Sequence, residues 1–387
     1  MKRRSLVYAL AAMAAPMARA QQAESASQQR LRQVMQQARD GGAAAPVPAE
    51  RLKLRADLLA EGEAALARVD TTAALSAFER AAVILHAADT EMGLVRTYMQ
   101  SGEYRRALSF GAHTAGAHLD AIGGTALYAW LLHAGGQEGI ARQLLAQARD
   151  RAPGQPLAAQ VEEALRASPP RPLGAMLQPP ARLAPYSRPL DLPAHARVVA
   201  SATLVGNGAA ALVPAAALSP GRRYWVRNGL GLVSAATAAP AARAHWLALL
   251  KLADPLPRYP VMRSAADAFP GSIAFAVEFA GQPDAAPAWP LLKSGFTGAA
   301  LDNAGTRALG VEMAPGGLRG GPVFDANGLL TGIALSARPA DLLVPVSRLQ
   351  QAFGADLFAA APARGARQGV DAVYEAALGP TLQLLRA

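Results

Sequence analysis

The sequence predicts a multidomain chain, in which an α-helical repeat part is followed by an all-β part. Ala, Leu, Glu and Arg dominate residues 51–167, and apolar residues recur there at the 3.6-residue spacing of amphipathic helices. Beyond His195, short runs rich in Val and Leu are interrupted by Gly, Asn and Pro, which is typical of strands joined by turns. Prolines crowd residues 168–195, and we expect this segment to be an extended spacer, because proline disrupts helices.

Composition limits the classes of function. The chain has 387 residues, of which 52% are hydrophobic, so it can bury substantial cores. It contains no cysteine, which excludes disulfides, thiolate metal sites and a cysteine nucleophile. The formal net charge is +10, but the sequence has no dense Lys/Arg stripe with interleaved aromatic residues, so we expect no nucleic-acid partner. The mild positive charge leaves weak contact with anionic envelope polymers as an alternative.

The first 20 residues have the organisation of a secretory signal peptide. Lys2-Arg3-Arg4 supplies the positive start, Leu6–Ala15 the short apolar run, and Ala18-Arg19-Ala20 an A-x-A cleavage site. The paired arginines fit a twin-arginine signal loosely, and an ordinary basic start is the alternative. We therefore expect export, most simply into the periplasm of a Gram-negative bacterium.

Two further expectations concern the N-terminal half. Residues 21–50 are rich in Gln and Ala and then in Gly and Pro, and are expected to form a low-complexity linker. No later apolar run of the sequence is long enough for a transmembrane segment, which needs about 20 residues.

The helical part repeats with a period of about 34 residues. Ala74, Ala107 and Ala141 are spaced 33 and 34 residues apart, and similar residues accompany them at fixed offsets. These are Val69, Gly102 and Gly136 five positions earlier, Phe78, Gly111 and Leu145 four positions later, and Ala81, Thr114 and Ala148 seven positions later. The period and the A-x3-F-x2-A pattern resemble the tetratricopeptide repeat. The resemblance implies three helical hairpins over residues 51–167 and a protein-interaction module, and an Ala-rich bundle without repeats is the alternative.

The strongest motif of the strand-rich part is Gly317–Ile333, which reads GLRGGPVFDANGLLTGI. Its Asn-Gly pair between two apolar runs predicts a hairpin. The string resembles the nucleophile loop and following hairpin of trypsin-like (chymotrypsin-fold, HtrA-type) serine proteases, and Arg319 stands at the serine position. Further along, Leu343–Val346 is similar to the strand that lines the specificity pocket in that family. A helix is expected over Val346–Phe353, with Gly354 placed to end it.

Two upstream segments extend the resemblance over residues 196–357, which it implies to be a trypsin-like double β-barrel. The segment WLALLKL is similar to the family's strand that begins with the catalytic aspartate, and Trp246 stands at that position. The segment ALVPAAAL is similar to the strand that ends with the catalytic histidine, and Ala216 stands there. An alternative register places Thr237 at the histidine position, which supplies no imidazole either.

These replacements exclude ordinary acyl-transfer chemistry, which needs a hydroxyl nucleophile, an imidazole and a carboxylate. Ala216 accepts no proton, Trp246 offers only an N–H donor, and Arg319 is permanently protonated. Neighbouring His245 is expected to face away from the cleft, because adjacent side chains of a strand point to opposite faces. The sequence therefore predicts a pseudo-serine protease without catalytic residues. A protease with non-standard catalytic residues and a structural envelope component are the alternatives.

Without that chemistry, the nucleophile loop is a candidate binding site for a peptide or another anion. The resemblance places oxyanion-hole N–H groups at Gly317 and Arg319, and Gly320 and Gly321 keep the backbone exposed. A permanent cation beside such N–H groups predicts capture of a carboxylate, for example a peptide C-terminus. The alternative is that Arg319 fills the cleft or points into solvent. We expect a protein or peptide partner and no cofactor.

No metal site is expected from the histidines. His113 and His118 lie five residues apart in the helical part, which suits a shared metal poorly. Single histidines such as His86 and His133 are interpreted as packing residues.

The tail, residues 358–387, has the order helix then strand. Val373–Leu385 resembles the lead-in found at the start of HtrA-type domains. Because it stands at the other end of the domain here, we expect it to complete the first barrel from the C-terminal side.

Overall fold

The computed structural model describes residues 46–166 and most of residues 192–387. The gaps in the second range are 238–239, 258, 260–261, 264–265, 280–287, 303–304, 313–316, 338–339 and 361–365. The expected signal peptide (1–20), most of the expected linker (21–50) and most of the expected spacer (168–195) lie outside the described residues. No helix in the described part combines the length and the apolar character needed to cross a bilayer.

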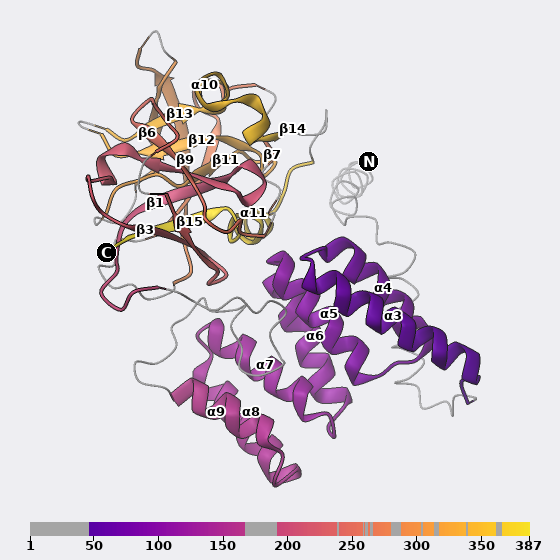
Figure 1. Ribbon diagram of the computed structural model, residues 1–387. Coiled ribbons are helices and arrows are strands. Elements are labelled where there is room, and N and C mark those ends of the chain that lie inside the picture. Colours follow the sequence, from indigo (N-terminus) through magenta and orange to yellow (C-terminus); the bar gives the residue numbers. More distant parts are fainter. Residues whose placement is uncertain are drawn as a thin grey trace, which may run out of the picture.

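The helical part is a stack in which each helix packs on the next (Figure 1). Its helices are α3 (Ala49–Ala67), α4 (Thr71–Ile84), α5 (Ala88–Ser101), α6 (Tyr104–Ala117), α7 (Ile122–Ala134), α8 (Glu138–Arg151) and α9 (Pro156–Arg166). Short turns join α3 to α4, α5 to α6 and α7 to α8, and the alternate helices α3, α5, α7 and α9 also contact one another. The prediction of three stacked hairpins is confirmed, and α9 closes the stack.

The repeated small residues lie where the helices approach most closely. Ala74, Ala107 and Ala141 are each 0% exposed and stand in the second helices of their hairpins. Phe78 fills the space beside the first of them, and a Cβ built at Gly93 of α5 would lie 2.5 Å from its ring. The alternation of small and large side chains is the packing that produces the visible period.

The positions five residues earlier share a backbone conformation. Val69, Gly102 and Gly136 lie in the turns of the three hairpins and have φ of 60°, 84° and 82°. Glycine adopts this left-handed region freely, whereas the Cβ of valine crowds the backbone there. The turn therefore explains why two of the three repeats carry glycine, and it leaves Val69 strained.

The first barrel is built from the strands β1 to β6 and the last strand of the chain. The strands are β1 (Arg197–Val205), β2 (Ala210–Pro214), β3 (Tyr224–Asn228), β4 (Val233–Ala236), β5 (Ala242–Ala244), β6 (Leu247–Lys251) and β15 (Thr381–Arg386), in the sheet order β4-β3-β15-β1-β2-β6-β5. The N–H of Thr237 donates to Lys251 O at 2.9 Å, and that of Ala253 to Ala235 O at 2.8 Å. These bonds join the β4 edge to β6 and close the ring of strands.

The C-terminal tail supplies a central strand of this barrel. β15 pairs antiparallel with β1 on one side and with β3 on the other, and Leu384 lies opposite Ala200 and Val226. The helix α11 (Val370–Ala377) leads into it. The expectation that the tail completes the first barrel is confirmed, so the strand-rich fold extends beyond residue 357 to the last strand.

The second barrel closes within its own sheet. Its strands are β7 (Met262–Arg263), β8 (Ile273–Glu278), β9 (Leu291–Ala300), β10 (Arg307–Gly310), β11 (Pro322–Phe324), β12 (Leu330–Leu335), β13 (Leu342–Pro345) and β14 (Ala359–Ala360). The order is β11-β8-β9-β10-β13-β12-β7-β14, and β11 also pairs with β12, which closes the ring. The hairpin and the helix α10 (Val346–Phe353) form where the sequence predicts them. The strand-rich part is thus the double barrel that the fold class predicts.

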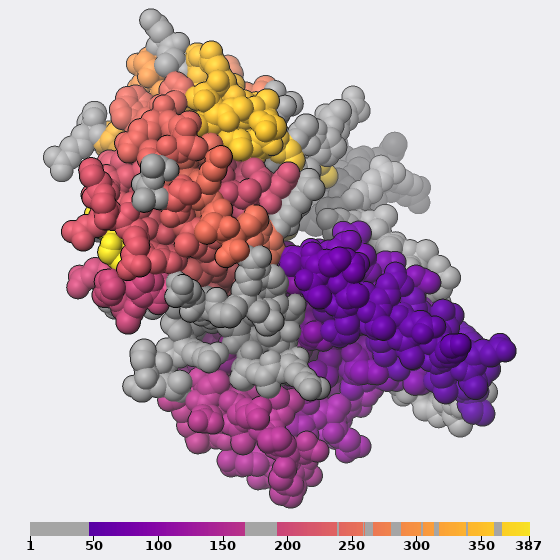
Figure 2. All heavy atoms as spheres, viewed as in Figure 1, coloured from indigo at the N-terminus to yellow at the C-terminus, as the bar shows by residue number. Residues whose placement is uncertain are grey.

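The helical stack docks on the first barrel at the turn end of its hairpins. In the space-filling view the two parts form separate lobes (Figure 2). Arg105 at the start of α6 donates from Nε and Nη2 to the Glu375 carboxylate of α11, at 2.9 and 3.1 Å. The Trp289 indole donates to Ala134 O at 2.5 Å and packs edge-on against Tyr104. One apolar cluster continues from the stack into the first barrel, and a second one lies between the two barrels.

Candidate functional site

The three positions matched to a catalytic triad converge where the two barrels meet. Ala216 lies in the 3₁₀ turn Ala215–Ala217 after β2, and Arg319 lies in the loop before β11. The N–H of Ala215 donates to Trp246 O at 2.8 Å, which places the second position beside the first. A Cβ at Gly320 would lie 2.7 Å from Pro214 Cδ, which places the third beside them.

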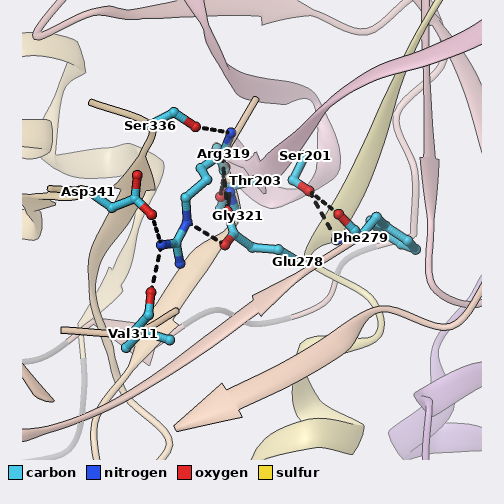
Figure 3. Close-up of polar contacts among 10 residues, drawn as sticks. Ser201, Thr203, Glu278, Phe279, Val311, Arg319, Gly321, Ser336 and Asp341 are labelled. Atoms are coloured by element: carbon cyan, nitrogen blue, oxygen red, sulfur yellow. Dashed lines mark hydrogen bonds and ion pairs between the residues drawn. The ribbon is translucent and has the colours of Figure 1, made fainter. Parts of the chain in front are cut away.

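Arg319 turns its side chain into the protein, where only 6% of the residue is exposed. Its Nε donates to Glu278 Oε2 at 2.8 Å, and its Nη1 donates to Val311 O at 2.9 Å and to Asp341 Oδ2 at 2.5 Å (Figure 3). Two carboxylates therefore face one guanidinium. Geometry of this kind, with charged partners and a carbonyl, fixes a buried arginine in one orientation.

Glu278 is the last residue of β8 and is 1% exposed. Its Oε1 accepts hydrogen bonds from the N–H groups of Gly320 and Gly321, at 3.3 and 3.2 Å. A Cβ at Gly321 would lie 2.4 Å from Val277 O, so only glycine permits this approach. Burial raises the pKa of the Glu278 carboxyl, and the Arg319 guanidinium and the two N–H groups act in the opposite direction.

The predicted anion site thus holds an anion that belongs to the chain itself. Of the four residues proposed for binding, Arg319, Gly320 and Gly321 contact the Glu278 carboxylate. Gly317 lies outside this network, exposed and with φ of 92°. Arg319 does not point into solvent, because its side chain is buried among these partners. Binding of an external anion by these residues stays a prediction, and it would require displacement of Glu278.

The hydroxyl groups near Arg319 are engaged with backbone. Ser336 Oγ accepts from the N–H of Arg319 at 3.1 Å, so the N–H expected in an oxyanion hole is occupied. Ser201 Oγ accepts from the N–H of Phe279 at 3.0 Å, and Thr203 Oγ1 donates to Gly320 O at 2.9 Å. These hydroxyls hold the loop before β11 against β1 and the end of β8.

His245 and Trp246 form a turn and not the start of a strand. β5 ends at Ala244 and β6 begins at Leu247, and the two residues between them have φ of 48° and 60°. The expectation that His245 points away from the cleft assumes that it lies on a strand. That premise is wrong, because His245 lies in the turn between the two strands. Positive φ at both central residues is the geometry of a type I′ hairpin turn, and it leaves the Trp246 indole 61% exposed.

A second cluster of polar side chains, which the sequence did not reveal, lies in the helical part. His86, His113 and His118 surround the buried carboxylate of Glu91. His113 and His118 contact different oxygens of that carboxylate, and the three residues whose ligand atoms lie within 4.8 Å of one another are His86, Glu91 and His113, so the expectation that His113 and His118 suit one shared metal poorly is not contradicted. His118 approaches Glu91 because α6 ends at Ala117 and His118 leaves the helical path with φ −122° and ψ 68°. A sequence signal was present in the Gly and Asp residues that flank His118 and favour the end of a helix.

Comparison with known proteins gives a likeness in fold. No family model matches the chain, and no curated protein matches it. The chain is similar to the MamO protease domain from Magnetospirillum magneticum in its apo form, at 22% identity over 41% of this chain and 95% of that one, with a TM-score of 0.30. It is also similar to a serine endoprotease from Yersinia pestis, at 17% identity over 41% of this chain and 61% of that one, with a TM-score of 0.33.

Proposed function

We propose that this chain is an exported, non-hydrolytic protein-binding scaffold of the periplasm, in which a protease-like double barrel is docked on a helical-repeat stack. The observation that carries the proposal is the buried network of Arg319 with Glu278 and Asp341. The signal-peptide pattern of residues 1–20 supports the export.

The network opposes a hydrolytic role for the barrel. A guanidinium cannot attack a carbonyl, and it cannot take the proton of a nucleophile at any physiological pH. Turning Arg319 out of the barrel would leave the Glu278 carboxylate buried without its cation, which is costly. The side chain therefore holds the place where a substrate carbonyl would have to enter.

The helical stack supports a role in binding. Stacks of helical hairpins provide extended surfaces that recognise peptides or proteins. Docking through Arg105, Glu375 and Trp289 ties this module to the barrel, which serves as a rigid platform. The partner is proposed to be a protein or a peptide of the cell envelope.

Hydrolysis is tested directly with the purified chain. Wild-type protein and an Arg319→Ala variant are incubated with unstructured casein and, separately, with a fluorophosphonate probe that labels active serines. We expect intact casein and no labelling for both proteins. Casein cleavage or labelling by the wild type that the Arg319→Ala variant lacks would establish the protease alternative and overturn the proposal.

Binding is tested by crosslinking of the full chain in an envelope extract, followed by reconstitution with each purified candidate. We expect at least one protein that binds directly at physiological salt. The structural alternative predicts cosedimentation with purified sacculi that disappears steeply as salt is raised, because such contact rests on charge alone. That result without a direct protein partner would replace the scaffold by an envelope-polymer component.

A further inference from the structure

We propose that His86, Glu91 and His113, with His118 beside them, form a binding site for a divalent transition-metal ion of the zinc type. The site lies in the helical part and is independent of the proposed function of the barrel. It is built from the loop between α4 and α5, the first turn of α5 and the end of α6.

The ligand atoms converge on one point. His86 Nε2 lies 3.2 Å from His113 Nε2, and both lie close to Glu91 Oε1, at 2.7 and 3.2 Å. His118 Nε2 lies 3.5 Å from the other carboxylate oxygen. Ligands held about 2.0–2.1 Å from a tetrahedral zinc ion are about 3.3 Å from one another. The two separations of 3.2 Å that involve His113 lie close to that value, and the one between His86 and Glu91, 2.7 Å, is shorter.

The contacts are not those of an ordinary hydrogen-bonded carboxylate. Both oxygens of Glu91 are buried, yet neither accepts a hydrogen bond of normal direction from the described residues, although an imidazole nitrogen is 2.7 Å away. Two ligands of one metal ion both direct their lone pairs at the ion. Their atoms can therefore lie close together without forming a hydrogen bond with each other. A buried carboxylate also requires a compensating cation, which a divalent ion supplies.

Two Nε2 atoms that face each other at 3.2 Å give the same indication. Two protonated imidazoles would repel at this distance, and a neutral pair satisfies at most one N–H. A metal ion accepts both lone pairs at once, together with the carboxylate. Imidazole and carboxylate ligands favour Zn²⁺, Co²⁺, Ni²⁺ or Cu²⁺ over Ca²⁺ and Mg²⁺, which prefer oxygen ligands alone.

Access and position fit an ion bound at the edge of the helical part. The Glu91 side chain is 2% exposed, whereas the side chains of His86, His113 and His118 are 17%, 14% and 18% exposed, so an ion reaches the cluster from one side. Three ligand atoms, from His86, Glu91 and His113, all lie within 4.8 Å of one another, and a tetrahedral ion would take its fourth ligand from water. The cluster lies at the end of α6 opposite to Arg105, so the ion would fasten the α4–α5 loop to α6 at the edge remote from the barrel.

The test is metal binding by the full chain after chelator treatment and dialysis. Titration with Zn²⁺ should show about one ion bound per chain, and Co²⁺ should give the intense visible absorption of a tetrahedral site. His86→Gln and His113→Gln should each weaken Zn²⁺ binding by at least about 100-fold and abolish the Co²⁺ spectrum. The matched control is His195→Gln, because His195 is an exposed histidine outside the cluster, and it should bind as the wild type does.

Each outcome is decisive. Absence of stoichiometric Zn²⁺ and Co²⁺ binding by the folded wild type would overturn the proposal, and this measurement depends on no variant. Equal binding by His86→Gln, His113→Gln and His195→Gln would place the ion elsewhere and would also overturn it. Cleavage of casein by the wild type would count against the proposed function of the barrel and would not affect this metal site, so the two failures are distinguishable.

Discussion

The Nε of Arg319 donates to the Glu278 carboxylate at 2.8 Å, and the side chains of the two residues are 6% and 2% exposed. Glu278 ends β8, Arg319 lies in the loop before β11, and the two are 41 residues apart in the sequence. The bond anchors the loop before β11 to the end of β8, while Asp341 and Val311 O hold the other end of the guanidinium. The loop before β11 is thereby fixed from inside the barrel.

Glu278→Gln should destabilise the chain by about 3–5 kcal/mol, because it leaves a buried guanidinium with only part of its compensation. The amide keeps an acceptor for the N–H groups of Gly320 and Gly321, so the loss reports mainly on the charge. The double variant Arg319→Met/Glu278→Gln should recover most of the stability in urea unfolding. Glu138→Gln breaks an exposed ion pair with Arg142 and serves as the control, with an effect of about 0.5 kcal/mol or less. A double variant no more stable than Glu278→Gln would contradict the pairing.

Val69→Gly should stabilise the helical part by about 0.5–1 kcal/mol. The left-handed conformation costs a valine about 1–2 kcal/mol, and glycine removes this strain. That gain exceeds the entropic cost of ordering a glycine. The companion variant Gly136→Ala introduces a Cβ at φ 82° and should destabilise by about 1 kcal/mol. Thermal unfolding of both variants tests whether Val69→Gly stabilises and Gly136→Ala destabilises the chain. Destabilisation by Val69→Gly would mean that the packing of the valine side chain outweighs its backbone strain.

The repeat could be predicted because its physical cause is local. Each hairpin needs small residues where its helices touch, and two of the three turns carry a left-handed glycine. These requirements repeat with every hairpin, so the spacing of Ala74, Ala107 and Ala141 shows the period directly in the sequence. The motif that includes Arg319 was equally local. The role of the tail strand is not local, because β15 pairs with β1 and β3 from far along the chain, and only the resemblance to a protease lead-in indicated it.

The partners of the functional side chains could not be predicted, because they are set by tertiary contacts. Nothing in the sequence near Glu278 indicates that its carboxylate reaches Arg319. His86 and His113 are 27 residues apart and meet only because α5 folds back on α6. His118 also reaches Glu91, because α6 ends at Ala117. Treating the whole segment as one continuous helix did not predict this end.

Leu384→Ala should destabilise the first barrel by about 2–5 kcal/mol, because the side chain is fully buried in a central strand. The neighbouring variant Arg386→Ala, at the partly exposed end of the same strand, should cost less than about 1 kcal/mol. Urea unfolding measures both. Similar small effects for the two variants would contradict a central position of β15.

Two buried tyrosines predict the behaviour of the helical stack in alkali. Burial raises the pKa of Tyr98 and of Tyr104 to about 12 from the ordinary value of 10. The folded chain holds these protons where the unfolded chain has lost them, so the stability they contribute is complete below pH 10 and is lost as the pH rises from 10 to 12.

The measurement is the free energy of unfolding as a function of pH over that interval, with phenolate absorbance as a second signal. Tyr104→Phe should make the decline shallower by about one proton released on unfolding. It also removes a hydrogen bond to Leu131 O of 2.9 Å, which should cost about 1 kcal/mol at neutral pH. An unchanged slope would show that Tyr104 titrates normally.

The docking of the stack on the barrel predicts a common unfolding transition. Trp289 contributes an indole hydrogen bond to Ala134 O and an edge-on contact with Tyr104, each worth roughly 1 kcal/mol. The double variant Trp289→Ala/Glu375→Gln removes these contacts and one of the two carboxylates that pair with Arg105, the other being Asp371. We expect it to separate unfolding into two transitions and to increase the radius of gyration in X-ray scattering, because the two lobes then move independently. Glu162→Gln, which breaks ion pairs of α9 away from this junction, should leave both measurements unchanged. A single transition and an unaltered radius in the double variant would show that other contacts of the apolar cluster hold the two parts together.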